Sequence, residues 1–275
     1  MNTIIDSKQV NLSSNSATIS NFPSNSVLTF YLSNILKKEP DILYNTISLV
    51  HAEIPVSYYI INTTNNFLSI TISGTTTNYT LLTGNYNATT FKTMLLTLLG
   101  AGWALTLSTT TGIFTLSYTS NFTINTSSTC YTILGFVKNT SYTSTSNNLI
   151  MPYQCNFLGV KRLKIKSNIL GTSNIDSYNG GRSNILCTIP ANNSSFGLII
   201  YNNISQFRTI YPNSNLDYID ITITDELDNI INFNGIDIYL TLQIDTIREH
   251  LPDNQDLTHL MKLQQEQDIY NSNNI

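Results

Sequence analysis

Two residues able to do acid/base or metal chemistry lie close together in one predicted strand. His51 and Glu53 are two positions apart in a stretch rich in β-branched and aromatic residues, and because side chains alternate along a strand they share one face. A histidine beside a carboxylate can transfer protons or bind a metal ion. We prefer a hydrogen-bonded structural pair, or two half-exposed polar residues, because no further ligand is identifiable nearby in the sequence.

An acidic cluster in a predicted loop is a second candidate site. Asp225, Glu226, Asp228 and Asn229 carry the oxygen ligands that Ca²⁺ takes. The cluster lacks the spacing and the glycine of an EF-hand loop, so we prefer a solvated turn. Calcium at Asp225 and Asp228 stays open as the alternative.

Three basic residues alternate along another predicted strand. Arg162, Lys164 and Lys166 are expected to project from one face, while Leu163 and Ile165 face the other. Three interpretations of these charges are open: a solvated sheet face, ion pairs with acids of a neighbouring subunit, or a weak contact with phosphate. These three residues are therefore interface candidates, with the choice among the readings left open.

Acidic residues are distributed too unevenly for an ordinary active site. None occurs throughout residues 54–175, and twelve of the seventeen lie from Asp217 onward. Asp217, Asp220 and Asp237 in that acidic third are natural partners for the basic residues, within the chain or between chains. Phosphate-binding, dinucleotide-binding and serine-hydrolase motifs are absent from the sequence. We therefore predict no catalytic activity, no cofactor and no metal ion.

Composition narrows the class of protein further. Only 11% of the 275 residues are charged, the net charge is -4, and asparagine occurs 36 times. A chain without a basic surplus is not a general nucleic-acid binder. No apolar run reaches the roughly 18 residues that span a bilayer, and the N-terminus does not look like a signal peptide. The neutral polar surface fits packing against copies of the same chain, and an AT-rich genome would explain it equally well.

The three cysteines have no spacing typical of a metal or redox motif. Cys130, Cys155 and Cys187 are an odd number, and no two form a CxxC pair. We prefer three buried, reduced thiols. One disulfide with a free thiol is the alternative.

Strand patterns dominate the elements that must position these residues. Stretches rich in β-branched and aromatic residues are separated by turns of Asn, Gly, Ser and Thr. The expected strands lie at 27–33, 45–61, 67–73, 79–82, 103–108, 113–118, 156–170, 185–190, 196–202, 206–212, 216–227 and 236–245. About a dozen strands without βαβ alternation predict an all-β, antiparallel fold, either a jelly roll or a related sandwich.

Two helices interrupt or follow the strands. In the first, Thr89 or Thr90 is the expected N-cap and Gly100 the expected C-cap. Its apolar face, expected to pack on a sheet, consists of Phe91, Met94, Leu95 and Leu98. The second, at 253–270 after Pro252, is a weaker amphipathic pattern built on Leu257, Leu260, Met261 and Leu263. Residues 1–22 are polar and weakly patterned, so they are expected to form an arm or a disordered tail.

Several segments, taken in order, resemble a known family of capsid proteins. They are an A-x-I-P-x-S-x-Y strand at 52–59, an Asn-Asn turn at 65–66, a G-N-Y lead into the first helix at 84–86, an L-G-F at 134–136, and a final N-G-x-x-x-x-x-x-L-Q strand at 234–243. In this order and spacing the chain looks like the penton and minor capsid proteins of virophages, Polinton-like elements and nucleocytoplasmic large DNA viruses. The resemblance covers residues 45–245.

The resemblance implies a jelly roll with an inserted β-rich segment. On that basis the roll comprises 23–62 and 155–247, the insertion 63–152, the N-terminal arm 1–22 and the C-terminal helix or tail 248–275. The first helix and the hairpin after it could instead cap the roll, and a two-domain arrangement split near 139–150 is a further alternative.

The function implied is structural rather than catalytic. The resemblance implies a penton subunit that forms homopentamers at the vertices of an icosahedral virion and contacts the major capsid protein and other shell proteins. Another minor capsid role, or a jelly-roll module that binds a host receptor or glycan, is the alternative. The interface candidates are Arg162, Lys164, Lys166, Asp217, Asp220, Leu257, Leu260 and Met261.

Overall fold

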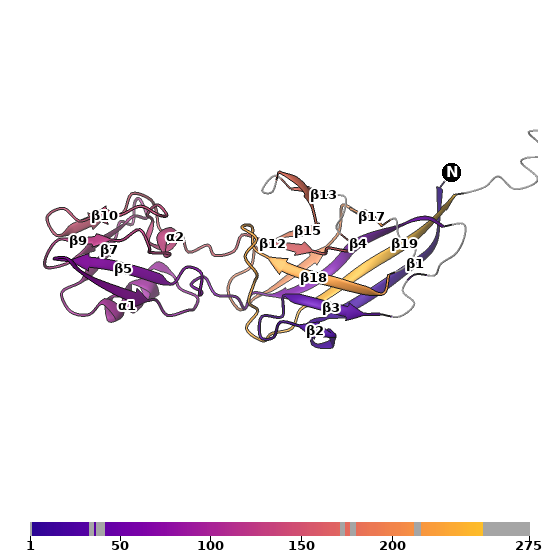
Figure 1. The fold of residues 1–275 in the computed structure, drawn as a ribbon, viewed down its shortest axis with the longest axis horizontal. Coiled ribbons are helices and arrows are strands. Elements are labelled where there is room, and N and C mark those ends of the chain that lie inside the picture. Colours follow the sequence, from indigo (N-terminus) through magenta and orange to yellow (C-terminus); the bar gives the residue numbers. More distant parts are fainter. Residues whose placement is uncertain are drawn as a thin grey trace, which may run out of the picture.

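The chain folds into two lobes joined by two thin connections (Figure 1). The computed structural model describes residues 2–32, 36, 42–170, 174–176, 180–211 and 216–249. The larger lobe combines the N-terminal strands with those after residue 161, and the smaller lobe is built from the stretch between them. Among the described residues, no helix combines the length and the apolar character needed to cross a membrane.

The larger lobe consists mainly of two antiparallel sheets. The first runs β1-β19-β4-β16, with β17 also paired to β4; its strands are β1 (Asn2–Ser13), β19 (Tyr239–Glu249), β4 (Ile42–Pro55), β16 (Leu198–Asn202) and β17 (Thr209–Tyr211). The second runs β15-β12-β18-β3-β2; its strands are β15 (Ile185–Pro190), β12 (Arg162–Lys166), β18 (Tyr218–Thr224), β3 (Val27–Tyr31) and β2 (Ile19–Ser20). A separate two-stranded sheet pairs β13 (Asn174–Asp176) with β14 (Gly181–Ser183).

The strand order is that of a jelly roll. Setting aside the short β2, β13, β14 and β17, the strands of the first sheet are the first, eighth, third and sixth in the chain. Those of the second sheet are the fifth, fourth, seventh and second. Two four-stranded sheets connected in this alternating way make a jelly roll, so the predicted fold class is confirmed.

The core of the roll lies between the inner faces of the two sheets. Along β18, Ile219, Ile221 and Ile223 are fully buried while the residues between them are more exposed. On the facing sheet Ala52 and Ile54 are equally buried. Each fully buried isoleucine contributes about 1.5–3 kcal/mol relative to exposure, so period-two alternation in these strands directly stabilises the sandwich.

The smaller lobe has its own sheets and two helices. One sheet runs β10-β9-β5-β6 and the other β11-β8-β7. The elements are β5 (Phe67–Ile72), β6 (Thr75–Thr80), α1 (Ala88–Leu99), β7 (Ala104–Leu107), β8 (Phe114–Ser117), β9 (Phe122–Ile124), α2 (Tyr131–Leu134), β10 (Tyr142–Thr143) and β11 (Asn148–Ile150). A second hydrophobic cluster, drawn from residues 61–151 and separate from that of the roll, fills this lobe.

The predicted first helix is confirmed as α1, with a different N-cap. Asn87 Oδ1 accepts hydrogen bonds from the backbone of Thr89 and Thr90, and Thr90 Oγ1 accepts one from Asn87 N, which completes a capping box. Phe91 is fully buried, with its ring centroid 6.0 Å from that of Phe114 and 5.3 Å from that of Phe157. The helix therefore packs inside the smaller lobe.

The glycine of the L-G-F segment has a clear steric role. Gly135 ends α2 at a φ of 89°, and a Cβ there would lie 2.1 Å from the carbonyl oxygen of Tyr153. Since no side chain fits at that separation, only glycine allows the chain to pass this close to itself. The carbonyl of Gly135 also accepts a hydrogen bond from Tyr153 N.

The N-terminal residues correct the expectation of an arm or a disordered tail. Residues 2–13 form β1, which pairs with β19 from Asn2 opposite Glu249 to Ser13 opposite Tyr239. Leu12 is buried in the core of the roll. The pairing partner lies more than two hundred residues away along the chain, so no local pattern indicates it. The segment near 139–150, considered as a split between two domains, likewise contains β10 and β11.

The predicted C-terminal helix at 253–270 falls outside the described residues. The same is true of the interface candidates Leu257, Leu260 and Met261. The last described element, β19, ends at Glu249 beside the start of β1. This end of the roll is the one away from the smaller lobe (Figure 1).

Candidate functional site

His51 and Glu53 share one face of β4, as predicted. The His51 Nδ1 is 2.7 Å from Asn202 Oδ1 on β16, and Nε2 is 3.4 Å from Glu53 Oε1. The hydrogen bond to Asn202 raises the pKa of His51 above its ordinary value; burial opposes it, and Glu53 adds to it. In the part of the chain that the structure describes, no group of three or more His, Cys, Asp or Glu side chains is arranged to hold a metal ion. The arrangement is that of a hydrogen-bonded structural pair.

The basic stripe on β12 has a partner that the sequence reasoning missed. Lys166 Nζ lies 2.6 Å and Lys164 Nζ 3.1 Å from the same oxygen, Asp228 Oδ1. Both lysine side chains are about nine-tenths buried, whereas Arg162 is exposed. A solvated sheet face is therefore wrong for Lys164 and Lys166. Burial acts to raise the pKa of Asp228, but the hydrogen bonds from Lys166 and Lys164 outweigh it and hold the pKa below its ordinary value.

The other acids proposed as partners have different roles. Asp220 accepts hydrogen bonds from Ser167 Oγ at 2.7 Å and from the backbone of Asn168 at 2.8 Å, so it stabilises the turn after β12. Asp237 accepts one from Ser14 Oγ at 2.7 Å. Asp217 is exposed, and its carbonyl accepts a hydrogen bond from Leu32 N. The structure therefore does not bring Asp217, Asp220 and Asp237 to the lysines.

The acidic loop after β18 uses its carboxylates within the chain. Asp225 Oδ1 accepts hydrogen bonds from the backbone of Leu227 and Asn229, each at 2.8 Å, and Oδ2 accepts one from Asn229 Nδ2. The Asp228 carboxylate faces the lysines of β12 instead. The two aspartates thus have separate partners, and the loop is a hydrogen-bonded turn.

The three cysteines are free, in agreement with the preferred prediction of reduced thiols. Cys130 is fully buried, and burial raises the pKa of its thiol to about 12. Cys155 and Cys187 are half-buried rather than buried, and burial raises their pKa values as well. A thiol with a raised pKa is a poor nucleophile at neutral pH.

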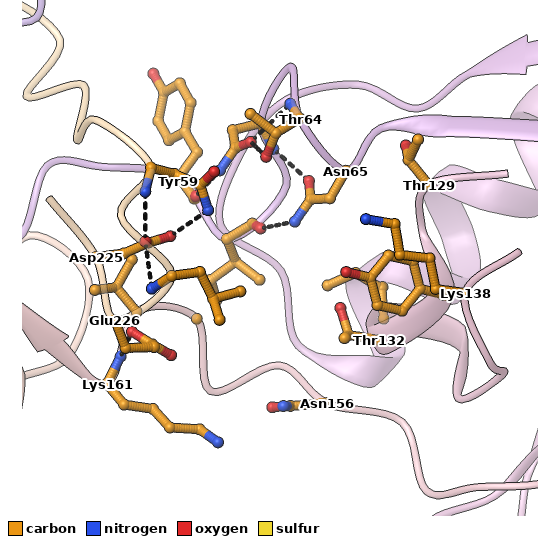
Figure 2. A pocket seen from close by; sticks show the side chains of 18 residues that line it. Tyr59, Thr64, Asn65, Thr129, Thr132, Lys138, Asn156, Lys161, Asp225 and Glu226 are labelled. Carbon is orange, nitrogen blue, oxygen red and sulfur yellow. Dashed lines mark hydrogen bonds between the residues drawn. The ribbon is translucent and has the colours of Figure 1, made fainter. Parts of the chain in front are cut away.

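A cleft of about 610 Å³ lies where the two lobes meet (Figure 2). It is lined by both connections between the lobes, by the start of α2 and by the acidic loop after β18; the residues include Tyr59, Asn65, Thr132, Lys138, Asn156, Lys161, Asp225 and Glu226. Sequence reasoning missed this cleft because its four walls are far apart in the chain. Glu226 Oε2 accepts a hydrogen bond from Lys161 N at 3.2 Å, which ties the loop to the second connection.

Two surfaces of the roll expose large apolar side chains. We name the first the β16–β17 edge; it consists of Phe196, Leu198, Ile200, Ile204, Phe207 and Ile210. We name the second the β2–β3 surface; it consists of Ile19, Phe22, Tyr31 and Tyr218. Ile204 is 92% and Phe22 74% exposed. Large exposed apolar side chains gathered along one edge of a fold are candidates for interaction surfaces.

The β16–β17 edge and the β2–β3 surface lie on opposite lateral edges of the sandwich. Cys187 of β15 and Tyr201 of β16 line one shallow hollow together, so β15 adjoins the β16–β17 edge. The strand β2 ends the second sheet at the side opposite β15. The roll therefore presents one apolar surface on each flank.

Comparison with known proteins gives matches among solved structures. No family model and no curated protein matches the chain. The crystal structure of the selenomethionine-labelled mavirus penton protein is similar with a TM-score of 0.46 and 11% identity, over 88% of this chain and 99% of that one. A chain of the cryo-EM structure of the Sputnik virophage is similar with a TM-score of 0.44 and 15% identity, over 87% of this chain and 98% of that one.

Proposed function

We propose that this chain is a structural subunit of a virion shell, namely the penton that forms homopentamers at icosahedral vertices. The observation that carries the proposal is the pair of apolar surfaces on opposite flanks of the jelly roll, the β16–β17 edge and the β2–β3 surface. The order of sequence segments that resemble capsid proteins supports the same assignment. The subunit acts by assembly and performs no catalysis.

A ring requires two different surfaces that fit each other. Such a head-to-tail contact closes after a fixed number of steps when the rotation between neighbours divides a full turn. The β16–β17 edge brings aliphatic residues and two phenylalanines, and the β2–β3 surface brings an exposed pair of tyrosines, Tyr31 and Tyr218, with ring centroids 5.7 Å apart. Aromatic side chains are enriched in the buried centres of interfaces, so the two surfaces suit one another.

The two lobes have different tasks in this proposal. We assign the roll to residues 23–62 and 155–247 together with β1, β2 and the end of β19, which pair within its sheets, and the insertion to 63–152, with Ile61 and Phe157 at its margins packing in the cluster of the smaller lobe. The start of β1 and the end of β19 lie at the end of the roll away from the insertion (Figure 1). On this arrangement the insertion points away from the shell, and the tail that follows β19 contacts the major capsid protein and other shell proteins.

Substitution of one interface residue tests the proposal. Ile200→Asp places a charge in the β16–β17 edge, and burying an unpaired charge strongly opposes association. The matched control is Ile150→Asp, because Ile150 is equally exposed, at 69% against 61%, but lies on the smaller lobe. Sedimentation velocity should show pentamers for the parent and for Ile150→Asp, and monomers for Ile200→Asp at the same concentration. Identical assembly of all three proteins would contradict the proposal.

A further inference from the structure

The cleft between the lobes is large enough for an extended ligand. The cleft has a volume of about 610 Å³ and adjoins a smaller hollow of about 200 Å³. Tyr59, Val160 and Asp225 line both. Every segment that lines the larger cleft is a loop or part of α2, so no strand edge opens into it. An extended peptide therefore has no strand to pair with there.

Several polar side chains on the walls are already occupied. Asn62 Oδ1 accepts from Thr64 N and Oγ1, and Asn65 bonds the backbone of Asn62 and Ile60. Asp225 accepts three hydrogen bonds from its own loop. These groups shape the cleft and have little capacity left for a ligand.

The remaining groups include the hydroxyls of Tyr59, Tyr131 and Thr132 and three nitrogen donors. Within the described ranges, the ammonium groups of Lys138 and Lys161 have no ion-pair partner, and Asn156 uses its Oδ1 for Leu158 N while its amide nitrogen has no recorded partner. Lys138 Nζ lies 5.9 Å from the ring centroid of Tyr131. Figure 2 shows Lys138 and Lys161 on different walls, with Asn156 between them along one side.

Two carboxylates line the same cleft, and that of Asp225 is engaged within its own loop. Glu226 has one carboxylate oxygen engaged by Lys161 N, and its other oxygen is available as an acceptor. A bare anion would meet one lysine at a time, because Lys138 and Lys161 lie on different walls, and would gain nothing from Glu226 or from the size of the cleft. A ligand with both an acid group and hydroxyl groups uses the whole set.

We infer that the cleft between the lobes binds an acidic saccharide. Lys138 holds its carboxylate or sulfate, while Lys161, Glu226 and Asn156 on the other side bind hydroxyl or amide groups, and the partly exposed ring of Tyr59 packs at the rim against a sugar face. Sites that bind small ligands combine apolar surface with a few convergent polar groups in this way. The inference is independent of the proposed shell role, because no residue of either apolar flank lines the cleft.

Titration of the intact protein with matched saccharides tests the inference. Calorimetry or ligand-observed NMR at low salt should show sialyllactose binding about tenfold more tightly than neutral lactose, since charge-assisted hydrogen bonds distinguish them. Lys138→Gln and Lys161→Gln should each weaken sialyllactose binding about fivefold to tenfold. Lys92→Gln on the exposed face of α1 is the matched control and should bind as the parent does.

Several results would each overturn the inference. These are equal binding of sialyllactose and lactose, no binding at roughly millimolar concentration, inorganic sulfate binding as tightly as the acidic saccharide, and tighter binding of a glutamate-rich peptide. Parent-like affinity in both lysine variants would do the same. Thermal unfolding of the variants provides the folding check, because neither ammonium group has an ion pair in the described chain. Loss of binding with an unchanged pentamer would separate this site from the shell role.

Discussion

Arg208 and Asp245 form an ion pair across β4, between the loop that leads into β17 and the strand β19 on the other side of β4. Arg208 lies immediately before β17, and Asp245 lies on β19. The Nη1 atom of Arg208 is 2.6 Å from Asp245 Oδ2. Only 2% of the Asp245 side chain is exposed. Its other oxygen accepts hydrogen bonds from Ser7 Oγ and Gln243 Nε2. A buried carboxylate of this kind depends on all of its partners.

Arg208→Gln should lower the free energy of unfolding by roughly 2–3 kcal/mol, less than for a fully buried pair because Arg208 is one-third exposed. The carboxylate would then remain buried without its cation. Chemical denaturation of the parent, Arg208→Gln, Asp245→Asn and the double variant measures the coupling between the two residues. A coupling near zero would show that the pair does not stabilise the sheet.

Asp228→Asn should destabilise the roll at neutral pH by roughly 1–3 kcal/mol, because the buried ammonium groups of Lys164 and Lys166 lose their shared carboxylate. Denaturant unfolding at pH 7 measures the change. Asp6→Asn is the matched control, since Asp6 forms an exposed pair with Lys8 at 3.1 Å and such pairs contribute little.

The same variant predicts a pH dependence with a defined sign. The pKa of Asp228 is lower in the folded chain than its ordinary value of 3.8. Its stabilisation is therefore fully present above the ordinary pKa and is lost as the pH falls through the lower, folded value. Between about pH 5 and the acid limit of folding, stability should fall less steeply for Asp228→Asn than for the parent. Parallel curves would contradict this assignment.

The cysteines should react in a fixed order. Cys130 is fully buried with a pKa raised to about 12, whereas Cys155 and Cys187 are half-buried. Maleimide labelling of native protein at pH 8, followed by peptide mass spectrometry, should modify Cys130 only when the protein unfolds. Labelling of Cys130 as fast as Cys155 would show that the smaller lobe opens without denaturant.

Phe91→Ala should destabilise the smaller lobe by about 3–5 kcal/mol, because it leaves a cavity among Tyr86, Phe114 and Phe157. If the insertion is a folding unit, hydrogen exchange should increase across residues 63–152 and stay unchanged in β18 and β19. Equal acceleration in both lobes would contradict the proposed division of the chain.

Local patterns were sufficient to predict the elements that depend on local interactions. The spacing of Phe91, Met94 and Leu95 predicts α1, and period-two alternation predicts β5 and the β7–β8 hairpin. The predicted N-cap, Thr89 or Thr90, was wrong because these threonines look as suitable as Asn87 in the sequence. The structure identifies Asn87 as the cap through two reciprocal hydrogen bonds, from Thr90 N to Asn87 Oδ1 and from Asn87 N to Thr90 Oγ1.

Non-local contacts explain what the sequence could not predict. The strand β1 needs β19, and Asp228 meets Lys164 and Lys166 only because a loop folds over β12. The alternation of the lysines predicted their shared face correctly. Their burial could not be predicted because neither the loop path nor its left-handed residue, Asp228 at a φ of 67°, has a signal in one sequence.

The cleft between the lobes illustrates the same limit. Tyr59, Lys138, Lys161 and Glu226 come from four separate segments, and each looks like an ordinary loop residue. Their convergence follows from the insertion of one lobe between β4 and β12 of the other. A site between two lobes can be recognised only when the paths of both connecting segments are known.

Native mass spectrometry of the unmodified full chain tests the central claim most directly. The proposed ring predicts a dominant species of about five times the 30.7 kDa subunit mass, which loses single subunits on activation, as expected of one repeated head-to-tail contact. A chain that stays monomeric at tens of micromolar, or forms an even-numbered two-fold assembly, would contradict the account.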